Sequence, residues 1–264
     1  MENFEFRPDD YLNRINYSRA LSLSAATLKR LHDAQVKSIP FENFDICLNQ
    51  SIKLGSANLF NKLVEHKRGG YCFELNGLML MALEHFGFSG RALLGRVHIT
   101  GVATGRTHQI SLITLNDEQW IVDTGFGSDT PEEPLPLVFN TEFETKTKTM
   151  RFIEHELFGT MLQVKKSGDW VNLYSFDMNH VCTGDIYTSN HFTSTNPNSI
   201  FVSSRIASLP TANGANTLFN YTLKQVVGND QVITELTPGQ PYIDALRQHF
   251  GIELQQPYDN FREC

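Results

Sequence analysis

The chain has 264 residues, of which 41% are hydrophobic and 19% charged, enough for one large domain or two to three small ones around sizeable cores. Twenty-nine acidic residues against 22 basic ones give a net charge of −7, and no basic run is dense enough to neutralise a row of phosphates, so we expect no nucleic-acid partner. The start has no signal-peptide pattern, and no segment approaches the ~20 apolar residues of a membrane-spanning helix, which predicts a cytoplasmic protein with no membrane contact.

The first third of the sequence predicts helices. Asp9 and Asp10 can cap a short first helix. Ser24 can cap a second, which should stop before Pro40 because a residue that precedes proline avoids the α region. Ser56 can cap a third helix.

A further helix is predicted after Gly69-Gly70, where the two glycines interrupt the helical pattern. Residues 73–86 are apolar around most of the helix circumference and are followed by Gly87, which describes a helix buried in the centre of the protein. Cys72 lies at its first turn.

Downstream of this helix the pattern changes to strands rich in Val, Ile, Leu and Thr. Segments 92–99, 108–115 and 119–125, with a turn at Asn116-Asp117, predict an antiparallel sheet or small barrel. Residues 130–136 hold three prolines and two glutamates, so we expect an exposed connection. Further strand candidates are 161–165, 170–174, 201–209, 218–227 and 231–235. Pro241 then opens a last helix, which Gly251 ends.

The four cysteines are Cys47, Cys72, Cys182 and Cys264. They form no C-x-x-C pair and no short-spaced Cys/His set of the kind that binds zinc. Because a chain of this length does not need disulfides for stability, we expect free thiols and no metal site.

Cys72 has the surroundings that a thiol nucleophile requires. Such a thiol must be largely thiolate near neutral pH, although a free cysteine titrates at ~8.5. A helix start favours an anion, and Arg68 adds a cation just upstream. Gly69 and Gly70 leave the sulfur open to a substrate.

The base must come from another part of the chain, with a third group to orient it. His108 begins one predicted strand and Asp123 ends the next, so a hairpin at Asn116-Asp117 would bring them side by side. By spacing alone, an inert cysteine, a structural histidine and a turn-forming aspartate remain open alternatives.

Four blocks of sequence resemble the arylamine N-acetyltransferase family, in the right order and at the right separations. They are Ile-Pro-Phe-Glu-Asn-Phe-Asp at 39–45, Arg-Gly-Gly-Tyr-Cys-Phe-Glu-Leu-Asn at 68–76, Arg-Thr-His at 106–108 and Val-Asp-Thr-Gly-Phe-Gly at 122–127. The resemblance extends over the whole length. It implies that Cys72, His108 and Asp123 form a catalytic triad.

The resemblance also implies an α+β fold with a cysteine-protease-like Cys-His-Asp core. Residues 1–87 would form an N-terminal helical bundle with the nucleophile, residues 88–195 a central antiparallel β-barrel with the histidine and aspartate, and residues 196–264 a C-terminal α/β lid. The implied reaction is acetyl transfer from the cosubstrate acetyl-coenzyme A to arylamines, arylhydrazines or similar amines. It would follow a ping-pong mechanism through an acetyl-cysteine.

Further site residues follow from the same resemblance. Glu42 and Arg68 would form a structural ion pair. Other positions match residues near the substrates: Phe126 for the acceptor pocket, and Thr107 and Gly127 for the coenzyme A tail, with core or turn roles as alternatives. Phe201 could reach the cleft, although packing is the preferred interpretation. The sequence has no glycine-rich phosphate-binding motif, so an open groove would hold the nucleotide end of coenzyme A. The sequence does not predict the oligomeric state.

Two other classes of function use or tolerate the same residues. A cysteine hydrolase or a transglutaminase-like enzyme shares the chemistry, and the acceptor pocket alone decides between water, amine and peptide. A non-catalytic binding scaffold is the third alternative. The amino-acid sequences around Cys72 and Asp123 favour the acetyltransferase. The presence of all three triad residues argues against a non-catalytic scaffold.

Overall fold

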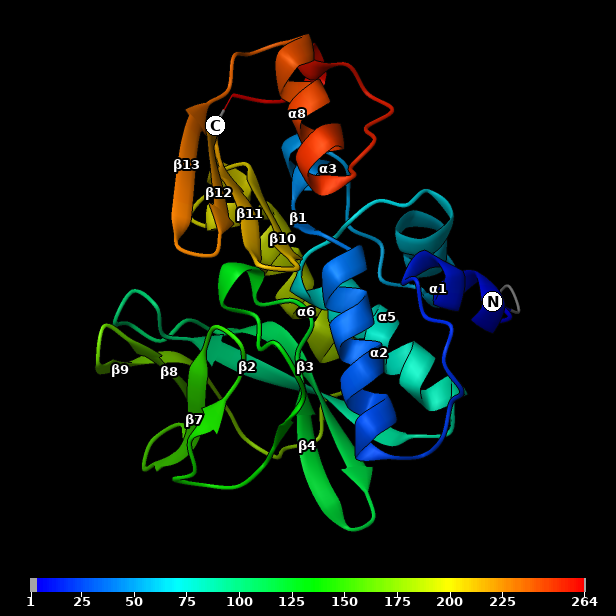
Figure 1. Ribbon diagram of the computed structural model, residues 1–264, viewed down its shortest axis with the longest axis vertical. Helices are drawn as coiled ribbons and strands as arrows, with labels where there is room; N and C mark the ends of the chain where they lie inside the picture. Colours follow the sequence, from blue (N-terminus) through cyan, green and yellow to red (C-terminus); the bar gives the residue numbers. More distant parts are fainter. Residues whose placement is uncertain (1–3, 264) are drawn as a thin grey trace.

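The computed structural model describes residues 4–263 (Figure 1). Its helices are α1 (Pro8–Arg14), α2 (Ala25–Ser38), α3 (Phe44–Cys47), α4 (Ser56–Phe60), α5 (Cys72–His85), α6 (Thr183–Thr195), α7 (Ile200–Ser203) and α8 (Gln240–Phe250), with the π-helical turn η1 (Asn61–Glu65) and the 3₁₀ turns η2 (Gly127–Asp129) and η3 (Tyr258–Asn260). Its strands are β1 (Phe41–Glu42), β2 (Ser89–Val97), β3 (Arg106–Leu115), β4 (Glu118–Val122), β5 (Leu135–Pro136), β6 (Phe143–Glu144), β7 (Thr149–His155), β8 (Gly159–Lys166), β9 (Asp169–Phe176), β10 (Ile206–Thr211), β11 (Gly214–Phe219), β12 (Thr222–Val227) and β13 (Asp230–Glu235).

The N-terminal helices begin and end largely where local chemistry requires. The Ser24 hydroxyl accepts a hydrogen bond from the Thr27 amide at 3.3 Å, and α2 ends at Ser38, so the predicted cap and stop of this helix are confirmed. The other predicted caps are wrong. Proline at position 8 opens α1 and Asp9 and Asp10 lie inside its first turn, while Gly55 caps α4 and Ser56 is its first residue.

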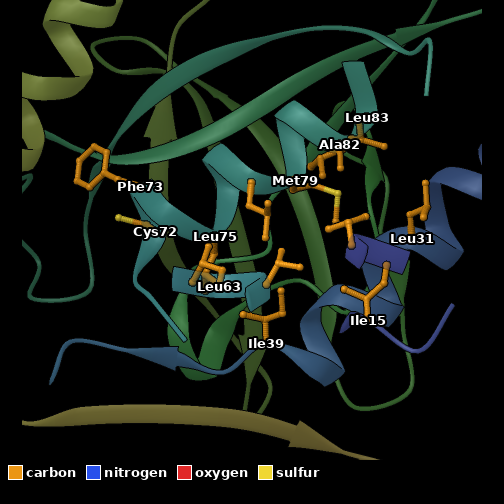
Figure 2. Close-up of a cluster of buried hydrophobic side chains, with 14 of the residues drawn as sticks. Ile15, Leu31, Ile39, Leu63, Cys72, Phe73, Leu75, Met79, Ala82 and Leu83 are labelled. Atoms are coloured by element: carbon orange, nitrogen blue, oxygen red, sulfur yellow. The ribbon is translucent and has the colours of Figure 1, made fainter. Parts of the chain in front are cut away.

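Helix α5 forms the centre of the largest core cluster. Its apolar side chains pack against α1, α2 and η1 (Figure 2), and the buried members include Leu28, Leu31, Leu63, Leu75, Leu78 and Met79. Burial of each side chain of this size stabilises the folded state by ~1.5–3 kcal/mol. Cys72 lies at the edge of the cluster, and Figure 2 shows its side chain directed away from the other labelled aliphatic groups. The core therefore fixes the helix while its first residue points out of the core.

An eight-stranded antiparallel sheet follows α5, in the order β5-β4-β3-β2-β9-β8-β7-β6. Asn116 and Asp117 both have positive φ (50° and 62°), as in the two-residue hairpin turns that match strand twist. Phe139, just after β5, forms a bridge with Phe152 of β7 near the opposite edge. This contact nearly closes the sheet, in agreement with the predicted barrel.

The connection at 130–136 was expected to be exposed, and this is wrong. Thr130 and Leu135 are buried, and β5 pairs with β4. The prolines do not prevent this, because an edge strand needs hydrogen bonds on one side only.

The second sheet has five strands in the order β1-β10-β11-β12-β13, with α8 packed beside it (Figure 1). Two predicted strands are corrected here. Segment 201–209 is split, because Ser199 caps the short helix α7 before β10 begins. Segment 218–227 is also split, because Asn220, at φ 54°, turns the chain between β11 and β12.

Helix α6 was not predicted. It is rich in Thr, Ser and Asn, which are poor helix formers, but its tertiary contacts stabilise it. Asn190 and Thr193 are buried, and the Tyr71 hydroxyl donates a hydrogen bond to the Asn190 side chain. In Figure 1 this helix lies near the centre, beside the start of α5. None of the helices formed by residues 4–263 has the length and apolar character needed to cross a membrane.

Candidate active site

Three elements bring the predicted triad residues together. Cys72 is the first residue of α5, His108 lies in β3, and Asp123 directly follows β4. His108 Nε2 lies 2.8 Å from Asp123 Oδ2, and the Cys72 thiol interacts with the same ring. The β3–β4 hairpin pairs Ser111 with Val122, so the predicted juxtaposition of the histidine and aspartate is confirmed.

The Asp123 carboxylate is fully buried, and protein groups satisfy it. Oδ1 accepts hydrogen bonds from Asn76 Nδ2 at 3.0 Å and from the Gly125 amide at 2.9 Å. A Cβ at Gly125 would lie 2.9 Å from the Cys72 Cα atom, so this close approach requires glycine. With Oδ2 on His108, the carboxylate has one orientation available to it.

Asn76 holds the Asp123 carboxylate in place, and the sequence alone predicts no role for it. Its Nδ2 also donates to the Gln109 carbonyl at 2.7 Å, and its Oδ1 accepts from the Thr124 amide at 2.8 Å. The spacing between Cys72 and Asn76 could have indicated this position, because residues four apart in a helix lie on the same face. A polar residue one turn after Cys72 therefore points toward the same site.

Charge defines the protonation state of the pair. Burial favours neutral His108, but the charge of Asp123 and the hydrogen bonds to Asp123 and Cys72 outweigh it and raise the pKa of His108 to about 10. Burial likewise opposes the Asp123 anion, yet His108, Asn76 and the Gly125 amide keep the pKa of Asp123 below its usual value. Near neutral pH the pair is an imidazolium beside a carboxylate.

Aromatic rings enclose the imidazole. Phe126 and Tyr174 pack on His108 with ring centroids at 4.7 and 4.9 Å, and they pack on each other at 5.0 Å. The Tyr174 ring was missed because it lies at the end of a predicted strand with no motif around it. Together these rings restrict the access of water to His108.

The predicted ion pair between Glu42 and Arg68 is confirmed. Arg68 Nη2 lies 2.8 Å from Glu42 Oε1 and 2.7 Å from Asp45 Oδ1. Glu42 is fully buried, and its second oxygen accepts from the Phe44 amide at 2.7 Å. The pair ties β1 and α3 to the segment that leads into Cys72.

Comparison with known proteins identifies the family. An N-acetyltransferase family model matches residues 24–258. The arylamine N-acetyltransferase / N-hydroxyarylamine O-acetyltransferase of Salmonella typhimurium is 33% identical over 258 residues, which cover 96% of this chain and 92% of the relative. The arylamine N-acetyltransferase of Escherichia coli is 36% identical over 193 residues, 72% of this chain and 68% of the relative. The chain belongs to the arylamine N-acetyltransferase family.

Solved structures of arylamine N-acetyltransferases have the same fold. The Salmonella typhimurium enzyme superposes with a TM-score of 0.90 at 30% identity, covering 96% of this chain and 94% of that one. The Mycobacterium marinum enzyme in complex with CoA gives 0.88 at 30% identity and 93% of each chain. These superpositions show that the chain has the fold of the arylamine N-acetyltransferases, with mixed helix and sheet and a nearly closed eight-stranded sheet.

The structure also gives the positions of Thr107, Gly127 and Phe201, the other residues predicted to lie near the substrates in this member of the arylamine N-acetyltransferase family. The Thr107 carbonyl oxygen is 3.8 Å from the Cys72 sulfur. Gly127, at φ 62°, starts the turn η2 beside Phe126. Phe201 packs on Phe41 and on the Tyr71 ring, with centroids at 5.9 and 5.6 Å, so the structure places it in the packing role that the sequence favoured.

Within residues 4–263, no set of three or more His, Cys, Asp or Glu side chains is arranged to hold a metal ion. Cys72 and Cys182 are free thiols, Cys47 is buried with its sulfur 3.6 Å from the Ser204 carbonyl, and Cys264 lies outside the described residues.

Proposed function

We propose that this chain transfers the acetyl group of acetyl-coenzyme A to an arylamine, arylhydrazine or similar amine through Cys72, with His108 and Asp123 as its partners. The observation that carries the proposal is the continuous contact from the Cys72 thiol through the His108 ring to the buried Asp123 carboxylate. Membership of the family supplies the reaction class.

The reaction has two steps that reuse the same groups. The Cys72 thiolate attacks the thioester carbonyl, the bond to the coenzyme A sulfur breaks, the His108 imidazolium gives its proton to that sulfur, and Cys72 carries the acetyl group. The amine then attacks this acyl-enzyme, loses a proton to His108, and leaves as the amide while the Cys72 thiolate is released. Asp123 holds the imidazole in the tautomer and orientation that both steps need.

The family resemblance supports roles for the remaining residues. Phe126, packed on His108, would contact the aromatic ring of the acceptor. Thr107 and Gly127 would lie along the coenzyme A tail, and an open groove would hold its nucleotide end. The start of α5 supplies backbone N–H groups for the oxyanion, which are commonly worth ~2.7–4 kcal/mol per donor. A cytoplasmic location stays a prediction.

The competing interpretations differ in what accepts the acyl group. Water in a hydrolase, or a peptide amine in a transglutaminase-like enzyme, would use the same Cys72. The aromatic enclosure of His108 favours a flat, apolar acceptor over water. The family relatives, all named for arylamine acetylation, favour the acetyltransferase as well.

The test is the mass of the intact protein after mixing with acetyl-coenzyme A. We expect one added acetyl group on the peptide that contains Cys72, and its loss when an arylamine is added, with the acetylated amine appearing in equal amount. Cys72→Ala should remain folded and unmodified, whereas the matched variant Cys182→Ala, at an exposed thiol, should behave like the native protein.

Two results would contradict the proposal. Acetylation that persists in Cys72→Ala would remove the nucleophile assignment. Free acetate produced at the same rate with and without an arylamine would identify a hydrolase instead.

A further inference from the structure

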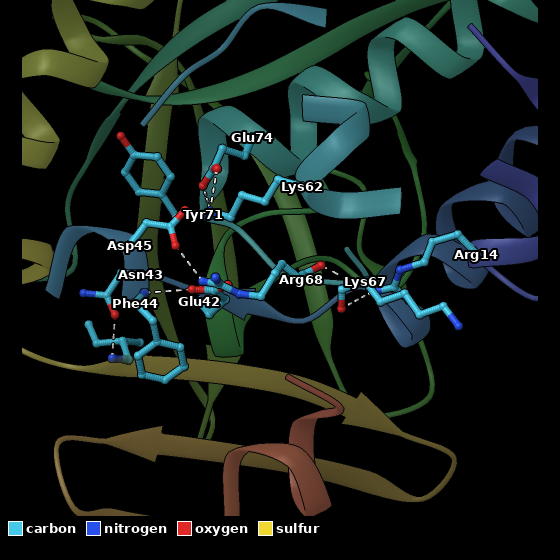
Figure 3. Close-up of polar contacts among 11 residues, drawn as sticks. Arg14, Glu42, Asn43, Phe44, Asp45, Lys62, Lys67, Arg68, Tyr71 and Glu74 are labelled. Carbon is cyan, nitrogen blue, oxygen red and sulfur yellow. Dashed lines mark hydrogen bonds and ion pairs between the residues drawn. The ribbon is translucent and has the colours of Figure 1, made fainter. Parts of the chain in front are cut away.

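A chain of five alternating charges runs under the start of α5, here called the charge chain: Glu42, Arg68, Asp45, Lys62 and Glu74 (Figure 3). Lys62 is the link that joins the Glu42–Arg68–Asp45 group to α5. Its Nζ lies 2.7 Å from Asp45 Oδ2 and 2.7 Å from Glu74 Oε1.

Glu74 connects the charge chain to the nucleophile. It is the third residue of α5, and its Oε2 accepts a hydrogen bond from the Tyr71 amide at 3.1 Å. A carboxylate at this position satisfies one of the unpaired N–H groups at a helix start. A Cβ on Gly70 would lie 2.8 Å from the same oxygen, so Glu74 packs directly against the loop before Cys72.

The buried negative charge of Glu74 lies close to the nucleophile and has to be compensated. Its side chain is 2% exposed, and it carries a negative charge in the same helical turn as the sulfur anion that acyl transfer requires. Burial raises the pKa of Glu74, and the Lys62 ammonium opposes this rise. Without a cation there, the Glu74 carboxylate would repel the thiolate.

The backbone of η1 delivers Lys62 to this position. Residues 61–65 form a π-helical turn, with the His66 amide bonded to the Asn61 carbonyl at 2.9 Å. Such turns insert an extra residue and occur mostly as short bulges, frequently at functional sites. The Arg68 amide then bonds to the Lys62 carbonyl at 3.1 Å, so one residue contacts both ends of the loop that leads to Cys72.

We infer that Lys62 is a positioning residue for the Cys72 nucleophile: it compensates the buried Glu74 charge and so holds the start of α5 in a form that accepts a sulfur anion. The inference rests on the proposed function, and it adds a residue outside the four sequence blocks. The charged groups that face Lys62 are Glu42, Asp45, Arg68 and Glu74. Those around Cys72 are Tyr71 and His108, with Asp123 behind His108.

The test is the pH dependence of Cys72 alkylation by iodoacetamide, followed on the peptide that contains Cys72. In Lys62→Met we expect the pH of half-maximal alkylation rate to rise by at least about 0.5 unit, because one compensating charge is removed. In Lys62→Arg the charge is retained, and the profile should return to that of the native protein. Lys53→Met, at an exposed lysine before α4, is the matched control and should change nothing.

Two further variants separate charge compensation from a purely structural role. Glu74→Gln keeps an acceptor for the Tyr71 amide and removes the negative charge, so its profile should shift to lower pH. Lys62→Met combined with Glu74→Gln removes both charges and should return to within about 0.2 unit of the native profile. A side chain that only maintained packing would not be rescued by a second substitution.

The outcomes are decisive either way. An unchanged profile in folded Lys62→Met, or a double variant that stays shifted, would overturn the inference. If Lys62→Met does not fold, Glu74→Gln decides, and the absence of a downward shift overturns it. Alkylation requires no acetyl transfer, so a native protein that cannot be acetylated but responds to these variants would refute the proposed function and leave the role of Lys62 standing.

Discussion

The end of the β3–β4 hairpin and the free edge of the five-stranded sheet, strand β13, both consist of short antiparallel strands, but they differ in burial and in polar contacts. At the end of the hairpin, the Asp123 carboxylate is buried and contacts Asn76, His108 and the Gly125 amide. Along β13 all six residues are exposed, and the apolar side chains of Val232 and Ile233 face solvent at 57% and 58% exposure. We therefore expect substitutions of buried side chains to be costly in this fold, and substitutions on the exposed edge strand to be tolerated.

The largest effect is expected for Asp123→Asn. The amide cannot hold the His108 ring as a paired imidazolium, and the equivalent change in serine proteases costs ~10⁴ in kcat. We expect kcat/KM for acetyl transfer to fall by about 10³–10⁴. Circular dichroism should report the native fold. A loss of less than tenfold would show that Asp123 is not needed to orient the base.

The pH dependence of stability is the next test. The folded pKa of His108 is about 10 against an ordinary 6.5, so its contribution is fully present below pH ~6.5 and is lost as pH rises through about 10. Between pH 7 and 10.5 we expect urea unfolding to show a loss on the order of 3 kcal/mol, at 1.36 kcal/mol per pKa unit. In His108→Gln this part of the pH dependence should disappear. Equal slopes in both proteins would contradict the assigned ion pair.

Asn76→Ala, also beside Asp123, should lower stability and activity by a smaller amount. The substitution leaves the Gln109 carbonyl and the Thr124 amide without their partner and removes one hydrogen bond from Asp123. We expect a loss of about 1–3 kcal/mol in the free energy of unfolding, with reduced activity. Gln225→Ala, at a half-buried amide of β12 in the five-stranded sheet, is the control. If both variants lose the same stability, the contacts to Asp123 have no special weight.

Local signals explain what the sequence could predict. Ser24 caps its own helix, Asn116-Asp117 turns its own hairpin, and that hairpin alone sets His108 beside Asp123. Each of these features depends on residues near one another in the chain, so the helix, the turn and half of the candidate site were predictable.

Contacts over long sequence separations explain what was missed. Helix α6 depends on a hydrogen bond between Tyr71 and Asn190, 119 positions apart, which no local pattern reveals. The role of Lys62 likewise depends on α3 and α5 meeting around one ammonium group. Tyr174 packs on His108 from a strand with no motif. Packing across the fold, and not propensity, places these side chains.

The smallest effect is expected at the other end of the comparison, for Ile233→Thr on β13. An exposed side chain on an edge strand, replaced by another β-branched residue, should change stability by less than about 0.5 kcal/mol and leave acetyl transfer unchanged. Leu223→Ala on the neighbouring strand, 2% exposed, should cost about 2–5 kcal/mol. Thermal and urea unfolding of the two variants measure the difference. If Ile233→Thr lowers the free energy of unfolding as much as Leu223→Ala does, the side chain of Ile233 must be buried in solution. Because Ile233 is exposed in the single chain, β13 would then contact a second molecule.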